Sequence, residues 1–445
     1  MAGLVASRPA ALRGPFHRGQ VRGAAGHSAV RDRHVVNQRL RVLHVIPSMG
    51  LLRGGPSVAV RTLARGLTRA GADVHIATTD DDGTGHLNVL LGRPVEEEGA
   101  TYWYFRRQTR SYAVSWPLTR WLAGRVANFD LVHIHALFSY AAVPASIFAR
   151  TRGVPYIVRP LGTLNRFGME RRRPMLKRLS YMLIERRILR DAAVVHYTSE
   201  AERREAALLG PPGQSIVIPH GIDLDGFGVV PSAGWLRRRA PHLAGRTIIL
   251  FLSRIDRKKG LDLLLPAFAR LRAERPKVAL VVVGDGEVEL VSKLRAEAAR
   301  LGIDRDVYWA GFLSGAEKFG ALADADVFVL PSYSENFGLS VVEAMASRLP
   351  VVISDQVAIH HEVADGGAGL VTPCQVAPLS AALASLVADP DLRARLGEAA
   401  RRLAERRFSA GAMTSAVLRM YHEILEQPNV EAFHWSGTQV LRSRR

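Results

Sequence analysis

The chain alternates short apolar runs with longer stretches whose apolar residues recur at helical spacing. In the first half, the run at residues 41–47 leads into a glycine-rich turn at residues 50–56 and then into such a stretch, which predicts strand, loop and helix. Because strands that alternate with helices pair in parallel, this half is predicted to form a parallel sheet with helices on both faces. The further strands expected here lie at residues 73–78, 131–135 and 155–158.

The same pattern restarts after an interval rich in proline and glycine at residues 210–234, whose expected pivot is residues 218–223. The second half is therefore predicted to be another doubly wound α/β domain. A final helix at about residues 410–425 has apolar residues on one face and is expected to cross back onto the first half. The strands predicted in the second half lie at residues 247–252, 278–283, 307–309, 327–330 and 351–353.

The fold class predicted is α/β, with two facing doubly wound domains and a ligand cleft between the carboxyl ends of their strands. A length of 445 residues with 48% hydrophobic residues is enough for two ordinary cores. The expected segments are a basic, disordered tail at 1–40, an N-terminal domain at 41–215, an interdomain linker at 216–235, a C-terminal domain at 236–409, a returning helix at 410–430 and a basic tail at 431–445.

Composition restricts the cellular compartment and the kinds of site and membrane segment that are expected. The single cysteine, Cys374, excludes an internal disulfide framework, gives no support to a zinc or iron–sulfur site, and favours a reducing, cytosolic compartment. No run reaches the roughly 18–20 apolar residues needed to cross a bilayer, and the N-terminus lacks the apolar core of a secretory signal. For residues 1–40 an over-extended start is an alternative to a disordered tail, and an organellar transit peptide is less favoured.

The formal net charge of +19 indicates an anionic partner. Residues 150–190 contain twelve Lys or Arg against two Glu, a surplus of ten positive charges. Within them, residues 174–190 combine that charge with an apolar stripe at helical spacing. Two interpretations stay open: the helix lies on an anionic membrane, or it buries its stripe in the first domain. The stripe consists of Met175, Leu176, Leu179, Met182 and Leu183.

Two glutamates stand eight positions apart in the second half, Glu335 in a polar loop and Glu343 expected in the first turn of an apolar helix. Carboxylates placed in this way present acceptors to a hydroxyl-rich ligand, which predicts a sugar or nucleotide clamp. Glu343 has a structural alternative, because the pattern from Ser340 to Glu343 matches a capping box. Glu335 has no comparable alternative and leads into Phe337, Gly338 and Leu339, whose amides at a helix N-terminus favour phosphate.

Cations follow the strand at residues 247–252. Arg254 and Lys259 lie in the turn that ends this strand, where two positive charges can hold a diphosphate; a solvated charged turn is the alternative. The loop with Gly54 and Gly55 offers close backbone approach and a helix N-terminus, although the strict dinucleotide and phosphate-loop patterns are absent and an ordinary turn is as good an account.

Histidines and aspartates supply the remaining candidates. His133 and His135 close one strand on the same face, and a histidine at the cleft edge can hydrogen-bond a sugar hydroxyl, a role favoured for His135 over His133. The run Asp80-Asp81-Asp82 has metal-binding spacing but lies far in sequence from the Arg/Lys turn and lacks supporting oxygens, so no metal site is assigned.

Taken together, these motifs resemble the retaining glycosyltransferases of family four, which have the two-domain GT-B fold. The resemblance covers about residues 41–425. It rests on the Gly54-Gly55 loop, the strand with His133 and His135, the turn at residues 254–260, and above all Ser334-Glu335-Asn336-Phe337-Gly338-Leu339 with Glu343-Ala344-Met345-Ala346. One departure is His220, where many members have Asn.

The resemblance implies a nucleoside-diphosphate sugar, UDP- or GDP-linked, as donor, with no cofactor and no metal. Arg254 and Lys259 would neutralise the leaving diphosphate, assisted by the Gly55 amide in the Gly54–Gly55 loop, and Glu335 would hold donor-sugar hydroxyls. His135 would touch the donor sugar near the reacting carbon.

The same resemblance assigns the nucleotide end of the donor. Glu343 would hold the ribose hydroxyls, and the amides of Phe337, Gly338 and Leu339 the distal phosphate. Phe312 and Leu313 would form part of the base pocket. The N-terminal domain would be the acceptor side.

The leading hypothesis is a retaining, metal-independent hexosyltransferase (EC 2.4.1.-) in cell-surface polysaccharide or glycolipid assembly. Its acceptor would be lipid-linked or a growing glycan, and its location cytoplasmic with peripheral attachment to the inner face of the cell membrane through residues 150–190. The alternatives are a soluble transferase for a small acceptor or storage glucan, and a nucleotide-sugar 2-epimerase of the same architecture. A nucleic-acid partner is disfavoured, because the stacking aromatics and recognised motifs of such proteins are missing.

Overall fold

The computed structural model describes residues 39–50, 54–83, 85–165, 169, 174–210, 213–227 and 234–426. The described residues belong to one compact unit that begins at Arg39. The tail predicted at residues 1–40 lies almost wholly outside them, as does the basic tail predicted at residues 431–445. Within the described ranges, no helix combines the length and apolar character needed to cross a bilayer.

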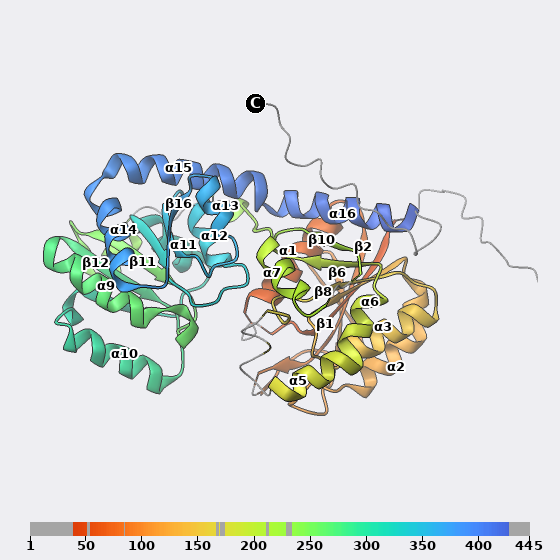
Figure 1. The fold of residues 1–445 in the computed structure, drawn as a ribbon. Coiled ribbons are helices and arrows are strands. Elements are labelled where there is room, and N and C mark those ends of the chain that lie inside the picture. Colours follow the sequence, from red (N-terminus) through yellow and green to blue (C-terminus); the bar gives the residue numbers. More distant parts are fainter. Residues whose placement is uncertain are drawn as a thin grey trace, which may run out of the picture. The chain divides into compact units, whose positions relative to one another are not determined.

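The first half forms an eight-stranded sheet in the order β10-β9-β8-β7-β1-β2-β6-β5 (Figure 1). Every pair is parallel except β5 with β6. The central strands are buried on both faces, which explains their continuous apolar runs. The strands are β1 Arg41–Ser48, β2 Asp73–Thr79, β5 Pro94–Glu97, β6 Ala100–Phe105, β7 Leu131–His135, β8 Tyr156–Arg159, β9 Val194–Tyr197 and β10 Ser215–Val217; β3 Asp81–Asp82 and β4 Gly85–His86 form a separate small ribbon.

Helices connect these strands. The α-helices of this half are α1 Gly55–Arg69, α2 Trp116–Arg125, α3 Ala142–Thr151, α5 Pro174–Ser180, α6 Arg186–Arg190 and α7 Glu200–Ala207. The helix expected at residues 174–190 is helical throughout, with a π-helical turn, Tyr181–Glu185, between α5 and α6. The apolar stripe predicted on it is exposed, and the interpretation that it is buried in the first domain is therefore wrong.

The second half is a six-stranded, fully parallel sheet in the order β13-β12-β11-β14-β15-β16. This order reverses direction between β11 and β14, and such a switch point opens a crevice at the carboxyl ends of the strands. The strands are β11 Thr247–Leu252, β12 Val278–Val283, β13 Val307–Gly311, β14 Val327–Leu330, β15 Val351–Ser354 and β16 Gly369–Thr372.

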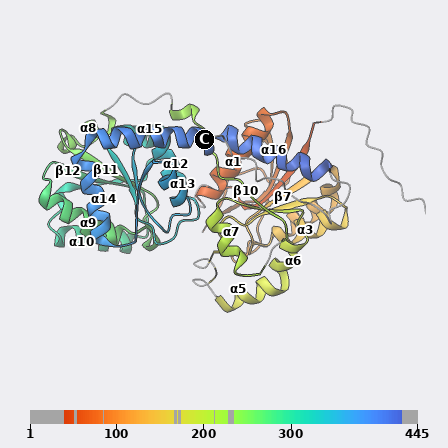
Figure 2. The same ribbon diagram turned by 45° about the horizontal axis from the view of Figure 1, so that its top comes forward.

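Helices of the second half surround its sheet, as Figure 2 shows for α9, α10 and α14. Its one large core is built from the buried strands and the apolar faces of these helices. The helices are α8 Trp235–Arg239, α9 Leu261–Glu274, α10 Val288–Arg300, α11 Gly315–Asp324, α12 Leu339–Ala346, α13 His360–Asp365, α14 Val376–Ala388, α15 Pro390–Arg407 and α16 Ala410–Glu426.

Helix α16 packs with the first sheet although it follows the second in sequence. It lies against α1, and its buried face joins the same apolar cluster as β1 and β2. That face consists of Met413, Val417, Met420, Tyr421 and Ile424. Because this helix completes the first core, the polypeptide crosses between the two halves twice.

The linker boundary predicted from the sequence needs one correction. Strand β10, Ser215–Val217, pairs with β9 and so belongs to the first sheet, although residues 216 and 217 were placed in the linker. The proline and glycine residues around β10 obscured a strand of only three residues, and hydrogen bonding to a neighbouring strand is what defines it.

Candidate active site

The turn after β11 positions Lys259. Residues Arg257–Lys259 form one 3-10 turn, capped by Asp256, whose side chain accepts a hydrogen bond from the amide of Lys258. Gly260 then adopts a φ of 74° before α9 begins. A Cβ atom on Gly260 would overlap the carbonyl oxygen of Pro331, so the turn packs directly on the loop that follows β14.

That packing brings Lys259 and Glu335 together as an ion pair, although each was predicted to contact a different part of the ligand. Lys259 is only 6% exposed, and the Glu335 side chain is also largely buried. Burial alone would raise the pKa of Glu335, but the adjacent Lys259 ammonium lowers that pKa below its ordinary value, with help from Lys258 and Arg254. The carboxylate therefore stays charged beside its cation.

Arg254 and Lys258 complete the positive side of this site. Burial, and then the charge of Lys259, lower the pKa of the Lys258 ammonium. Arg254 is exposed, and within the described residues its guanidinium makes no ion pair. Its guanidinium is therefore accessible to an anionic ligand.

The loop that carries Glu335 is held by backbone hydrogen bonds. The Glu335 amide donates to the carbonyl of Gln356 at 3.1 Å, and the Ala358 amide donates to the carbonyl of Glu335 at 2.9 Å. Gly338 ends the loop with a φ of 88° and caps α12. The Phe337 ring is buried against His220, with 4.8 Å between ring centroids, so only its backbone is available to a ligand.

The expectations for Glu343 need correction. Helix α12 begins at Leu339 and is capped by Gly338, so Ser340 lies inside the helix and forms no capping box with Glu343. Glu343 lies beyond the first turn. Its carboxylate instead accepts a hydrogen bond from the Lys318 ammonium of α11 at 2.8 Å. The pairing leaves Glu343 partly exposed and oriented by a neighbouring helix.

Two helix N-termini approach each other at this site. Gly54, with a φ of 74°, precedes α1, and a Cβ atom on Gly55 would lie 3.4 Å from Cδ1 of Leu339 at the start of α12. Free amides and helix dipoles make each end favourable for an anion. The Gly54–Gly55 loop therefore adjoins the loop of Glu335, as a shared phosphate site requires.

Phe312 and Leu313, assigned to a base pocket, follow β13. Phe312 is 69% exposed, whereas Leu313 is buried in the core of the second half. Phe312 is thus free to stack on a planar ligand, while Leu313 supports the loop from beneath.

A polar cavity of about 180 Å³ lies next to Glu335 and is lined by residues from both halves of the chain. Asn336 lines this cavity and links the two halves, because its side-chain amide donates to the hydroxyl of Thr198 at 3.2 Å. Glu202 also lines it and accepts hydrogen bonds from Thr198 and Gly162, while burial raises its pKa.

Sequence reasoning missed Glu202. A signal was present: Ser199 caps α7, and the Ser-x-x-Glu pattern from Ser199 to Glu202 marks a helix start directly after a strand.

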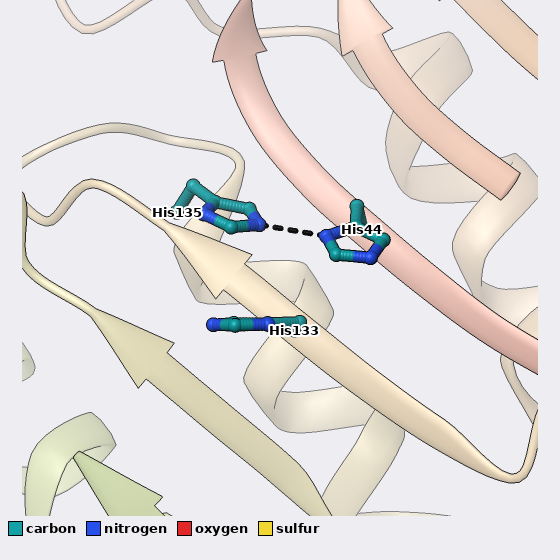
Figure 3. A group of neighbouring side chains, drawn as sticks. All are labelled: His44, His133 and His135. Carbon is teal, nitrogen blue, oxygen red and sulfur yellow. Dashed lines mark hydrogen bonds between the residues drawn. The ribbon is translucent and has the colours of Figure 1, made fainter. Parts of the chain in front are cut away.

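His135 lies in a buried histidine cluster rather than on an exposed cleft wall. It shares a hydrogen bond with His44 at 2.9 Å, and its ring stacks on that of His133 (Figure 3). Burial, followed by the charges of His44 and Arg159, lowers its pKa well below the ordinary value, so the imidazole is neutral. The His135 side chain is fully buried, and its contact with the donor sugar stays a prediction.

The three histidines of Figure 3 are also the one group of potential metal ligands within the described residues, with ligand atoms inside 4.8 Å of each other. Both nitrogens of His133 are engaged, however, with Tyr421 at 2.7 Å and His196 at 3.4 Å. The nearby Arg159 guanidinium would repel a cation. These contacts favour a hydrogen-bonded network over a metal site.

Two of the three aspartates at residues 80–82 form ion pairs with arginines. Asp81 forms a buried ion pair with Arg107, and the carboxylate of Asp80 lies 3.0 Å from Arg106. Both aspartates are buried. These ion pairs give the two carboxylates a structural role.

Each half of the chain matches a known family model. The family model described as "Glycosyl transferase 4-like domain" matches residues 54–221, and the model "Glycosyl transferases group 1" matches residues 236–403. The chain is 31% identical to MMP alpha-(1->4)-mannosyltransferase of Mycolicibacterium hassiacum, over 69% of this chain and 73% of that protein.

Two further relatives come from Mycolicibacterium smegmatis. The GDP-mannose-dependent alpha-(1-6)-phosphatidylinositol monomannoside mannosyltransferase is 33% identical over 48% of this chain and 58% of its own length. The phosphatidyl-myo-inositol mannosyltransferase is 34% identical over 50% of this chain and 55% of its own length. The match therefore spans little more than half the length of these two relatives.

Solved structures show the same architecture. Anabaena HepE in complex with UDP and glucose superposes with a TM-score of 0.71 at 21% identity, covering 86% of this chain and 100% of that chain. Sucrose-phosphate synthase from Thermosynechococcus elongatus gives 0.71 at 22% identity, covering 87% and 99%. With two family models that together span most of the described residues and a relative matched over most of its length, the chain belongs to the family-four glycosyltransferases of GT-B fold and is a glycosyltransferase.

Proposed function

We propose that this enzyme transfers a hexosyl unit from a nucleoside-diphosphate sugar to a lipid-linked acceptor in glycolipid or cell-surface polysaccharide assembly. The observation that carries the proposal is the Lys259–Glu335 ion pair beside the facing N-termini of α1 and α12. A diphosphate and the sugar attached to it need a cation, free amides and a carboxylate close together, and this site supplies all three.

In this proposal the Lys259–Glu335 ion pair breaks when the donor binds, and each side chain contacts a different part of the donor. The diphosphate takes over the Lys259 ammonium, and Glu335 then accepts hydrogen bonds from sugar hydroxyls. The charge of the diphosphate grows as the glycosidic bond breaks, so Lys259 and Arg254 stabilise the transition state more than the ground state. Protein cations would thereby supply the electrostatic stabilisation that a metal ion gives other transferases.

Donor identity is proposed from the relatives. One of them is named as GDP-mannose-dependent and several as mannosyltransferases, so GDP-mannose is the first donor to test. Exposed Phe312 is the proposed stacking partner of the base, and the carboxylate of Glu343, oriented by Lys318, the proposed ligand of the ribose.

The acceptor and location are proposed on related grounds. Two relatives are named for phosphatidylinositol-based acceptors. The exposed apolar and basic surface of α5 and α6 suits attachment to an anionic membrane, and we place the enzyme on its cytoplasmic face. We also propose that transfer retains the anomeric configuration and needs no metal.

The experiment compares purified wild type with Lys259→Ala and Glu335→Ala in a panel of nucleotide sugars. The preferred donor should raise the melting temperature of the wild type, and each substitution should lower kcat/KM by about 100-fold or more. Lys293→Ala, an exposed lysine on α10, is the matched control. NMR of the product reports its anomeric configuration, and activity should persist in EDTA. Full activity of the Lys259→Ala enzyme would rule out the proposed site.

A second acceptor class has one observation in its favour. Another relative, from Kineococcus radiotolerans, is named as a D-inositol 3-phosphate glycosyltransferase and is 31% identical over 56% of this chain and 61% of its own length. Assaying phosphatidylinositol and inositol phosphate side by side with the same donor decides between a lipid and a small soluble acceptor.

A further inference from the structure

The segment from α5 to α6 connects β8 to β9 and is a crossover of the first sheet. One face of it packs on that sheet, because Tyr181, Ile188 and Leu189 join the apolar core there. The opposite face of such a crossover normally meets water and is polar. In Figures 1 and 2, α5 lies at the outer edge of the helices around this sheet.

That outer face is apolar. Met175 is 84% exposed and Leu183 is 68% exposed, and three neighbouring apolar side chains are exposed with them. An exposed apolar patch of this kind marks an interaction site. The other three are Leu176, Leu179 and Met182.

Positive charge accompanies the apolar face. Five basic residues lie between Pro174 and Arg190, and the one acidic residue there, Glu185, is buried. An apolar face with a basic border matches a helix that lies in the interface of an anionic bilayer. The five are Lys177, Arg178, Arg186, Arg187 and Arg190.

A cavity of about 230 Å³ opens beside this face. Leu183 and Ile184 from the π-helical turn form one wall, and Val143 and Ile147 of α3 form another. The cavity volume is below the roughly 300–1,000 Å³ of typical small-molecule sites. The cavity therefore suits part of a lipid acyl chain rather than a whole sugar nucleotide.

Three arginines converge on one carboxylate at the rim of the cavity. Arg150 lies 3.0 Å from Asp191, Arg190 lies 2.9 Å from it, and Arg187 lies 3.7 Å from it. Three guanidinium groups and one carboxylate leave a surplus of two positive charges. Arginine forks bind phosphate well in such a setting.

We propose that the α5–α6 face and the adjoining cavity bind an anionic phospholipid of a membrane surface. The phosphate lies on the arginines around Asp191, part of an acyl chain enters the cavity, and the exposed apolar residues enter the bilayer.

This lipid site is separate from the proposed donor site. The cavity is lined by Tyr156 at the start of β8 and by Asp191 just before β9, so it lies at the amino ends of these strands. Glu202 and Asn165, near the donor loop, follow the carboxyl ends of the same strands. The lipid site rests on the membrane attachment proposed above for the α5–α6 surface and adds a phosphate site and an acyl-chain cavity to it. It can be tested without glycosyl transfer.

The test is sedimentation of the full chain with vesicles of phosphatidylcholine alone and of phosphatidylcholine with phosphatidylglycerol, at 150 mM salt. The wild type should bind the anionic vesicles at least about tenfold more tightly. Leu183→Glu, which alters both the outer face and the cavity wall, should weaken that binding about tenfold or more. Leu208→Glu, at an 84% exposed leucine after α7, is the matched control and should bind as the wild type does.

Two further arms separate the alternatives. Inorganic phosphate at millimolar concentration should not displace the protein from vesicles, whereas full displacement would identify a free-phosphate site. Lys259→Ala should bind vesicles normally, which separates this proposal from the donor site. If Leu183→Glu binds anionic vesicles like the wild type, only the net charge of +19 attracts the protein and the lipid site is wrong.

Discussion

Two buried glutamates of this enzyme have pKa values shifted in opposite directions. In both, burial favours the neutral acid; at Glu335 the Lys259 ammonium overcomes that effect, and the pKa falls. At Glu185 no cation contributes, and burial raises the pKa to about 7 despite hydrogen bonds from Ser180 and the backbone of Phe138. Between Glu335 and Glu185, the neighbouring cation is what decides which carboxyl is ionised.

Glu185 should therefore reduce stability as pH rises. Its folded pKa lies above the ordinary value of 4.5, so the native state holds the proton more tightly and the free energy of unfolding falls between about pH 4.5 and 7. Glu185→Gln should stabilise the protein at pH 8 by roughly 1–3 kcal/mol and have little effect at pH 4.5. Urea unfolding at the two pH values measures this; an equal effect at both would contradict it.

At the scale of elements, the join between the turn Arg257–Lys259 and α9 holds the site together. The positive φ of Gly260 allows the chain to turn sharply, and its missing side chain lets the turn pack on Pro331. Helix α9 then anchors the turn through its buried face in the core of the second half. The position of Lys259 thus depends on a backbone contact made by the next residue.

Gly260→Ala should disrupt the connection between the turn Arg257–Lys259 and α9. Besides the roughly 1–2 kcal/mol that an L-residue pays in the left-handed region, the new Cβ would overlap the Pro331 carbonyl. We expect a loss of at least about 3 kcal/mol and a matching loss of donor binding, measured by thermal unfolding with and without donor. Gly302→Ala is the control, since Gly302 has a φ of 68° with nothing within 4 Å of a Cβ; equal losses in both would refute the role of the contact.

At the scale of the whole molecule, buried histidines link elements distant in sequence. His133 of β7 forms a hydrogen bond with Tyr421 of α16. Arg159 of β8 forms a hydrogen bond of 2.7 Å with His220, in the segment between the halves. Burial is the main cause that lowers the pKa values of these histidines, and the charge of Arg159 contributes at each of them. The pKa of His44 falls to about 3. The histidines of the network are His44, His133, His135, His196 and His220.

The network should make the protein sensitive to acid. These histidines are neutral in the native state, so their contribution is complete above the ordinary pKa of 6.5 and is lost as pH falls below it. At about 1.4 kcal/mol for each histidine at pH 5.5, five would remove roughly 7 kcal/mol, comparable with a total stability of about 5–15 kcal/mol. Urea midpoints at pH 7.5 and 5.5 test this, and His220→Asn should lessen the difference; unchanged midpoints would contradict it.

The sequence by itself determined the fold class and much of the local structure. Strands such as Leu131–His135 and Thr247–Leu252 have the predicted bounds, because apolar runs and turn residues are local signals. The segments with Lys259 and Glu335 were also recognisable, since residue type and spacing carry that chemistry. Short strands such as Ser215–Val217 were not, because pairing with a neighbour defines them.

Only the tertiary structure decided what each charged or apolar side chain meets. Lys259 and Glu335 are 76 positions apart and become one ion pair, and the Tyr421 hydroxyl reaches His133 across 288 positions. Glu343 pairs with Lys318 instead of capping its own helix, and the apolar face of α5 is left exposed. Burial and long-range Coulomb interactions depend on how distant segments pack, and residue spacing along the chain does not encode that packing directly.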